Sequence, residues 1–290
     1  MVVKSTKTID IYATTIKRLR NAVAPNSSGL DFLMETDKIV EWVEAQDWSI
    51  NTKKACYIAC KSVLRDCNEP RYKDAEQKYS ERMLFYRDQH NEAAVQQLLS
   101  PREKELFVTW PKILAAREKF LRGCETFFDY QDYVIYSLYV LQPPVRLDYT
   151  PMRVVATSQE AADISGNCLV ADASGFYFLL REYKTAVKYG ELKLDVPPVL
   201  HAVLEKWLEL NPSGWLLGAQ GGQPMTEAHL GQQIRNIMKK AVGKSLGINM
   251  LRHSYITYQR RGEPTLLQQQ EMARRMGHSV GMSQIYRRLL

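Results

Sequence analysis

The chain has 290 residues, which is enough for two domains that each bury their own core. With 45% hydrophobic and 24% charged residues, its composition excludes an intrinsically disordered protein. No apolar run approaches the roughly 18–20 residues that span a bilayer, and the first ten residues lack the apolar stretch of a secretory signal. We therefore expect an intracellular protein without a membrane segment.

The net charge of +7 is concentrated near the end of the sequence. Residues 231–290 contain 11 Lys/Arg and only two Asp/Glu. A local basic excess of this kind suits a polyanion such as a phosphate backbone. A solvated basic helix face would give the same count, so charge alone does not decide the function.

The five cysteines give no sign of a metal site. Their number is odd, and Cys56 and Cys60 lie four residues apart in an apolar-periodic stretch without further Cys or His ligands close by. We expect reduced thiols in a reducing compartment and no bound metal.

The first hundred residues predict a helical domain, residues 1–98. Ser5 can cap a helix in which Ile9, Tyr12, Ile16 and Leu19 recur at three- and four-residue steps. A break at residues 25–29 separates it from three further predicted helices, at about residues 35–44, 49–67 and 72–97.

A domain junction is predicted at residues 98–101, because Ser100 can cap a new helix with Pro101 in its first turn. In the second domain, residues 101–290, the period changes to that of strands between two groups of helices. The predicted fold class is mainly α with a small, three-stranded antiparallel β-sheet (α+β). Helices are expected at 107–121, 127–141, 199–210, 226–241, 250–261, 266–276 and 279–290, and strand-like segments at 153–156, 168–170, 175–180 and 192–196, the last two flanking a hairpin at 181–191.

The chemistry-bearing pattern is a scattered set of polar residues in the second domain. No Gly-rich phosphate loop, metalloprotease motif or paired carboxylates stand out in the sequence. The set consists of Arg146, Lys184, Arg252, His278 and Tyr286.

The segments around these residues resemble the four catalytic boxes of the tyrosine recombinase family. They are residues 143–149, 183–186, 251–255 and 276–286, in the order of the family and at plausible separations. The double proline before Arg146 and the hairpin motif around Lys184 are most similar to recombinases of eukaryotic mobile elements and large DNA viruses. Each box is weak alone, but four in this order, ending in a tyrosine, are hard to produce by chance.

The resemblance implies DNA cleavage through a covalent tyrosine. Attack on a phosphodiester builds negative charge on the phosphate oxygens, and the fixed guanidinium groups of Arg146 and Arg252 suit its stabilisation. The resemblance assigns protonation of the leaving 5′ oxygen to Lys184, with Lys188 as the fallback on the same hairpin. His278 would hydrogen-bond the scissile phosphate.

Tyr286 is the expected nucleophile, since it is the only tyrosine after His278. A phenol has an ordinary pKa near 10, so it needs a base or a cationic pocket to attack at neutral pH. A 3′-phosphotyrosyl bond keeps the energy of the broken bond, so we expect no cofactor, ATP or metal.

One position departs from the family pattern. The family usually has a histidine three residues before its second arginine, and here that residue is Asn249. Asparagine can donate a hydrogen bond to a phosphate but cannot act as a base. This leaves open which group takes the tyrosine proton. His253 points about 100° away from its neighbour Arg252 on a helix, so we expect it to have a packing role.

The resemblance also implies the partners. Residues 1–98 would be the core-binding domain and residues 101–290 the catalytic domain, which together close on double-stranded DNA. Four copies on two DNA sites, with a dimer at each site, would exchange strands through a Holliday junction, in the nucleus if the host is eukaryotic. Phosphate contacts or ordinary surface charges are expected at Lys53, Lys54, Lys239 and Lys240.

Two other functions remain open on the sequence. A type IB topoisomerase would use the same residues to relax supercoils without exchanging partners, although the helical N-terminal domain favours a recombinase. A catalytically inactive DNA-binding regulator derived from a recombinase is favoured by Asn249 alone. Against it stand the intact motif residues Arg146, Lys184, Arg252 and Tyr286.

Overall fold

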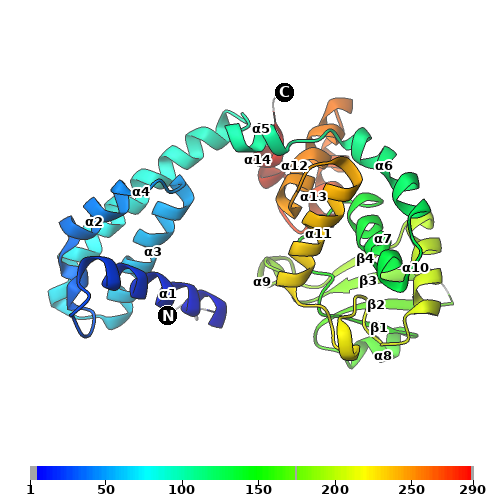
Figure 1. Cartoon of the computed structure of the whole chain (residues 1–290), viewed down its shortest axis with the longest axis horizontal. Helices are drawn as coiled ribbons and strands as arrows, with labels where there is room; N and C mark the ends of the chain where they lie inside the picture. Colours follow the sequence, from blue (N-terminus) through cyan, green and yellow to red (C-terminus); the bar gives the residue numbers. More distant parts are fainter. Residues whose placement is uncertain (1–4, 174, 289–290) are drawn as a thin grey trace. The chain divides into compact units, whose positions relative to one another are not determined.

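The computed structural model describes residues 5–173 and 175–288 and divides into two compact units, Met1–Gln96 and Gln97–Leu290 (Figure 1). The predicted junction at residues 98–101 lies next to this division. Each unit is described by itself below. In the described part of the chain, no helix is long and apolar enough to cross a membrane.

The first unit is helical, as its apolar periodicity indicates. Ser5 and Ser49 each cap a helix by accepting a hydrogen bond from the backbone N–H three residues later. The predicted helix starts at these residues are therefore confirmed. The unit consists of α1 (Thr6–Val23), η1 (Asp31–Met34), α2 (Thr36–Ala45), α3 (Ile50–Cys67), η2 (Pro70–Tyr72) and α4 (Lys73–Val95).

A half-buried carboxylate lies at the edge of the core of the first unit. Glu44 accepts hydrogen bonds from the hydroxyl groups of Tyr57 and Tyr86 and from the ammonium group of Lys53. Burial alone would raise the pKa of Glu44, but these hydrogen bonds and the charge of Lys53 together lower it. The polar cluster ties α2 to α3 and α4 within an otherwise apolar core.

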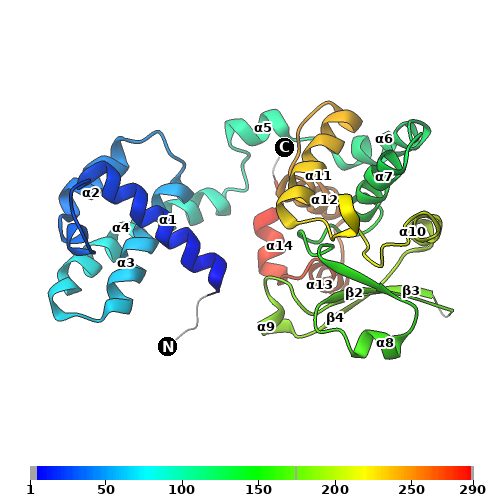
Figure 2. The same cartoon turned by 60° about the horizontal axis from the view of Figure 1, so that its bottom comes forward.

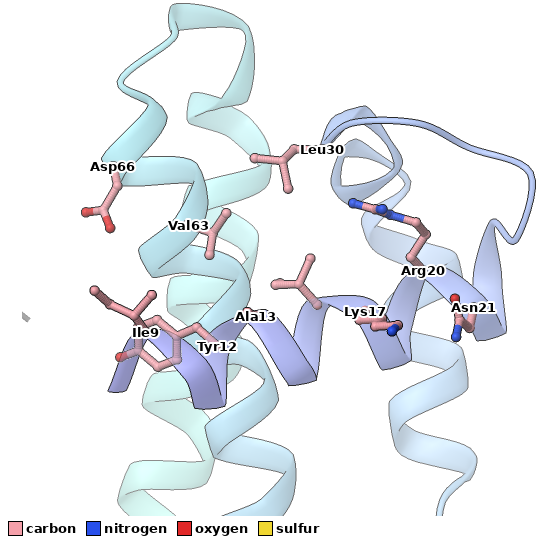
Figure 3. A pocket seen from close by; sticks show the side chains of 10 residues that line it. Ile9, Tyr12, Ala13, Lys17, Arg20, Asn21, Leu30, Val63 and Asp66 are labelled. Carbon is pink, nitrogen blue, oxygen red and sulfur yellow. The ribbon is translucent and has the colours of Figure 1, made fainter. Parts of the chain in front are cut away.

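A surface cavity of about 500 Å³ lies where α1 crosses α3 (Figure 3). Ile9 and Tyr12 of α1 face Val63 of α3 across it, and the charged groups of Arg20 and Asp66 lie at its edges. The cavity belongs entirely to the first unit.

The second unit packs helices on one small sheet (Figure 2). Its central helix α7 (Phe127–Val140) is buried along most of its length and contacts α6, α10 and α11. The other elements are α5 (Pro101–Leu106), α6 (Trp110–Arg122), α8 (Ser158–Ala162), α9 (Ala186–Tyr189), α10 (Pro198–Leu210), η3 (Gln220–Gly222), α11 (Glu227–Val242), α12 (Ile248–Gln259), η4 (Arg260–Gly262), α13 (Leu266–Arg275), α14 (Val280–Tyr286) and strands β1 (Met152–Val155), β2 (Asn167–Asp172), β3 (Gly175–Leu180) and β4 (Leu192–Asp195).

The sheet differs from the three-stranded antiparallel sheet expected from the sequence. Four strands pair in the order β1-β2-β3-β4, and β1 is parallel to β2, so the sheet is mixed. The reason is that α8 lies between β1 and β2 in the chain and returns the chain to the same end of the sheet. The fold class, mainly α with a small sheet, is confirmed.

Side chains alternate between the two faces of β2. Leu169 packs into the main core, whereas Cys168 and Val170 pack beneath α8 with Ala161. Both faces are therefore covered, which explains why residues 168–171 of β2 are all apolar rather than alternating with polar residues.

Asn167 joins the sheet to the loop that follows α7. Its buried amide accepts hydrogen bonds from the backbone N–H groups of Arg181 and Glu182 and donates to the carbonyl groups of Asp148 and Glu182. One side chain thus fixes both the loop of Arg146 and the start of the β3–β4 connection.

We predict that Asn167→Ala lowers the free energy of unfolding of the second unit by about 2–3 kcal/mol, because it leaves several buried backbone groups without partners. Hydrogen exchange of the β2 and β3 amides across a urea titration measures this. The exposed Asn236→Ala is the matched control and should stay within about 0.5 kcal/mol of the wild type. Equal stabilities of the two variants would contradict the proposed structural role of Asn167.

Candidate active site

The second unit brings the five motif residues to one place. Arg252 lies in the middle of α12 and Tyr286 is the last residue of α14. His278 lies in the turn between α13 and α14, Arg146 in the loop after α7, and Lys184 in the β3–β4 connection. The positive charges of Arg252, Arg146 and Lys184 all act on the Tyr286 hydroxyl group.

Arg252 is the centre of the site. Its side chain is 0% exposed, and its guanidinium group donates to the carbonyl oxygens of Pro144 (2.6 Å) and Met276 (3.2 Å). The guanidinium carbon also lies 4.9 Å from the centre of the Tyr286 ring. Because the carbonyl groups are neutral, most of the positive charge of Arg252 remains available to an anion or to the tyrosine.

The hydroxyl group of Tyr286 is activated by its surroundings. Burial alone would raise its pKa, but the charge and hydrogen bond of Arg252 and the charges of Arg146 and Lys184 outweigh burial and lower the pKa. All other tyrosines with a resolved shift have raised pKa values. Among the described tyrosines with a resolved shift, Tyr286 therefore differs in having a lowered pKa, as a nucleophilic phenol would require.

His278 is buried beside Tyr286, and the two rings are stacked with centroids 5.5 Å apart. Burial and the charge of Arg252 lower the pKa of His278 to about 4, so the ring is neutral at neutral pH. Its Nδ1 lies 3.0 Å from the carbonyl oxygen of Ser279, which can only accept, so Nδ1 carries the proton. Nε2 is then a lone-pair acceptor, and no described group hydrogen-bonds to it.

The backbone groups of Arg146 hold its loop in place. Its N–H donates to the carboxylate of Asp148 (3.0 Å), and its carbonyl accepts from Tyr139 (2.6 Å). Burial raises the pKa of Asp148, while the N–H of Arg146 and the charges of Arg146 and Arg252 oppose the increase. The loop thereby presents the Arg146 guanidinium to the same space as Arg252.

The β3–β4 connection is fastened to the histidine turn. Thr185 donates a 2.7 Å hydrogen bond to the carbonyl of Gly277, and a Cβ atom at Gly277 would lie 3.4 Å from the Tyr183 ring. Gly277 also has a positive φ of 64°, which favours glycine. Lys184 is exposed and acts on Tyr286, whereas Lys188 lies over the ring of its neighbour Tyr189.

Asn249 and His253 occupy α12 on either side of the sequence position of Arg252. Asn249 is exposed in the first turn of the helix. His253 is buried as expected, but it does more than pack. Its Nδ1 lies 2.7 Å from the carbonyl oxygen of Tyr286, and its ring lies 5.0 Å from the ring of that tyrosine.

Sequence reasoning missed two residues next to the site. Arg288 donates to Glu103 (3.2 Å) and to Nε2 of His253 (3.2 Å). Glu103 lies 185 positions from Arg288 in the chain, so no local pattern indicated the pair.

The four lysines expected at phosphates differ in their surroundings. Lys53 is mostly buried and pairs with Glu44, which disfavours a role at the DNA surface. Lys54 is half-buried, and Lys239 is exposed at the end of α11. Lys240 is exposed but pairs with the buried Asp132 at 3.4 Å.

The described residues contain no cluster of three or more His, Cys, Asp or Glu that could hold a metal ion, and all five cysteines are free. The five motif residues contribute guanidinium, ammonium, imidazole and phenol groups. These groups bind and stabilise an anion and move protons.

Comparisons with known proteins identify the fold. No protein-family model and no curated protein sequence matches the chain. Among solved structures, the chain is similar to the XerH site-specific recombinase in a post-cleavage complex with its palindromic difH substrate. The TM-score is 0.53 at 18% identity, covering 96% of this chain and 75% of that one.

Two further solved structures are similar at lower scores. They are XerA recombinase (TM-score 0.44, 15% identity, 99% of this chain and 88% of that one) and the Tn1549 transposon integrase with transposon right end DNA (TM-score 0.43, 13% identity, 96% and 94%).

The similarity to XerH, which covers 96% of this chain, confirms the predicted tyrosine recombinase fold. At this level of identity the similarity shows the fold alone, so the function rests on the geometry of the site.

The buried histidines predict a pH-dependent stability. Burial and the charge of Arg288 lower the pKa of His253 to about 4, against about 6.5 in an unfolded chain. Between these values the unfolded state binds more protons, so stability is present above about pH 6.5 and is lost as the pH falls toward 4. His278 acts in the same sense. The loss is up to about 3 kcal/mol for each group.

Thermal unfolding between pH 4 and 8 tests this prediction by comparing wild type with His253→Gln. We expect a shallower fall in melting temperature for the variant. His229→Gln, at an exposed position in α11, should keep the wild-type slope. If the two variants showed the same slope, His253 would not be buried in its neutral form.

Proposed function

We propose that the protein is a site-specific tyrosine recombinase that cleaves and rejoins DNA through a 3′-phosphotyrosyl intermediate at Tyr286. The observation that carries the proposal is the position of Tyr286, a described tyrosine with a lowered pKa that is held against a buried arginine and within the influence of two further cations. Such a group is poised to attack an electrophile that binds to the same cations, and a phosphodiester meets this description.

In the proposed reaction, Arg146 and Arg252 bind the non-bridging oxygens of the scissile phosphate. The oxygen of Tyr286 attacks phosphorus, the bond to the 5′ oxygen breaks, and Lys184 delivers a proton to that oxygen. Religation is the reverse, with the freed 5′ hydroxyl attacking the phosphotyrosine. The bond energy is conserved, so the chemistry of this chain's own residues requires no ATP.

His278 can supply the proton acceptor that Asn249 cannot. Its Nε2 has a lone pair and no described hydrogen-bond partner, and its ring lies against the Tyr286 ring. We propose that Nε2 accepts the tyrosine proton and that the resulting imidazolium then donates a hydrogen bond to a phosphate oxygen. Asn249, exposed at the start of α12, would serve as a neutral donor to the same phosphate.

The proposed partners follow from this reaction. The substrate is double-stranded DNA, and strand exchange requires four copies on two sites, with a dimer at each site and a Holliday junction between the two exchanges. The first unit would be the core-binding domain, and the protein would act where its DNA is located.

We predict that the wild-type chain forms a denaturation-resistant adduct with nicked duplex DNA and that Tyr286→Phe forms none, because only the phenol oxygen can make the covalent bond. The DNA should come from the ends of the element that encodes the protein. Labelled DNA migrating with the protein on denaturing gels measures the adduct. Tyr258→Phe, at an exposed tyrosine of α12, should retain the adduct. Tight binding of these ends without any adduct would favour the inactive regulator.

We predict that Lys184→Ala slows cleavage at least about 100-fold, because the leaving oxygen loses its acid. A substrate with sulfur in place of the bridging 5′ oxygen leaves without a proton and should restore the rate. Lys188→Ala is the matched control on the same connection and should cleave both substrates at the wild-type rate. Sulfur rescue of Lys188→Ala alone would transfer the role to Lys188.

A further inference from the structure

The backbone carbonyl of Tyr286 is connected to α5 by a directional series of hydrogen bonds through His253, Arg288 and Glu103. Nδ1 of His253 lies 2.7 Å from the carbonyl oxygen of Tyr286, so Nδ1 must carry the donated proton. Nε2 of the neutral ring then accepts from Nη2 of Arg288, 3.2 Å away. The same Nη2 lies 3.2 Å from Oε1 of Glu103. A protonated His253 could not accept from Arg288, so the series requires the neutral ring.

Arg288 is held on several sides by its side chain and its backbone. Its side chain is 11% exposed. Its Nη1 donates to the carbonyl oxygen of Ile285 at 2.6 Å, where the last turn of α14 leaves carbonyl groups without helical partners. Its backbone N–H donates to Thr257 of α12 at 3.0 Å. These contacts fix the end of α14 against α12.

Glu103 ties the same series to the beginning of the second unit. Its Oε2 accepts from the backbone N–H of Ser100 in the capping box of α5, and its Oε1 accepts from Arg288. Burial alone would raise the pKa of Glu103, but the hydrogen bonds with Ser100 and the charge and hydrogen bond of Arg288 together lower it. The carboxylate therefore stays charged, and α5 begins a few residues after the division between the two units.

We propose that Glu103, Arg288 and His253 form a positioning network that sets the backbone of Tyr286 for attack and ties it to α5. This inference rests on the proposed function. The helix α14 has seven residues, which is too short to be stable by itself, so the position of its last residue depends on outside contacts. A displacement of about 1 Å at a reacting atom can cost about 100-fold in rate.

Arg288→Ala and Arg287→Ala form a matched pair, because each removes one positive charge and only Arg288 takes part in the network. Single-turnover cleavage of nicked DNA is measured over a range of protein concentrations. We expect Arg288→Ala to lower the maximal rate about tenfold or more, while the half-saturating concentration stays within about twofold. Arg288→Lys should recover part of the rate.

A double-mutant cycle with Glu103→Gln separates positioning from the loss of charge. Glutamine keeps an acceptor for the cap of α5 but removes the charge that holds Arg288. Adding Glu103→Gln to Arg288→Ala should lower the rate no further than Arg288→Ala alone, because both act through one network. Independent, multiplicative losses would overturn the proposal, as would equal losses in Arg287→Ala and Arg288→Ala.

Hydrogen exchange without DNA gives a readout that does not depend on activity. Amides of residues 280–286 should exchange at least about tenfold faster in Arg288→Ala than in Arg287→Ala, with unchanged melting temperatures. Unchanged exchange would overturn the network whether or not the protein cleaves DNA. Faster exchange combined with no adduct from the wild type would retain the network as a device that orders α14 and would reject the recombinase function instead.

Discussion

The site depends on the burial of the Arg252 charge. A fully buried guanidinium group is costly unless its donors find partners. Here the two terminal nitrogens donate to the neutral carbonyl groups of Pro144 and Met276, and the phenol of Tyr286 is a further partner, whereas Nε has no described hydrogen-bond partner. The first carbonyl fixes the loop of Arg146, and the second fixes the turn of His278. One buried cation thus aligns three chain segments that are far apart in the sequence. No carboxylate of the described residues forms a salt bridge with it, and the same charge lowers the pKa of both Tyr286 and His278.

Much of the fold follows from interactions between neighbouring residues, but the pairing of the strands in the sheet does not. Ser5, Ser49 and Ser100 begin helices because their hydroxyl groups accept from N–H groups of the first turn, and this depends only on neighbouring residues. The strands were also recognisable by composition. Their pairing was not, since the direction of β1 relative to β2 depends on the path of the chain through α8. The sequence pattern therefore predicted a small sheet but gave the wrong arrangement.

The candidate site divides in the same way. The motif residues could be selected because each occurs within a short recognisable segment, and the structure places all five together. The contacts of Lys53 could not be foreseen, since whether a lysine meets solvent or a half-buried carboxylate such as Glu44 depends on the packing of separate helices. The pairing of Arg288 with Glu103 could not be predicted from the sequence for the same reason. Neither forms a motif, and they meet only when the chain returns to α5.

The two histidines next to Tyr286 explain how the site accommodates Asn249. Both rings are buried near arginines, which keeps them neutral, and in both a backbone carbonyl group selects the tautomer that carries a proton on Nδ1. Their Nε2 atoms then differ in one respect. That of His253 is occupied by Arg288, so the ring serves the backbone of Tyr286, whereas no described group occupies that of His278. Only the open lone pair of His278 could therefore accept the tyrosine proton in the proposed reaction. The chain thus retains a proton acceptor beside the phenol even though the residue three positions before Arg252 has none.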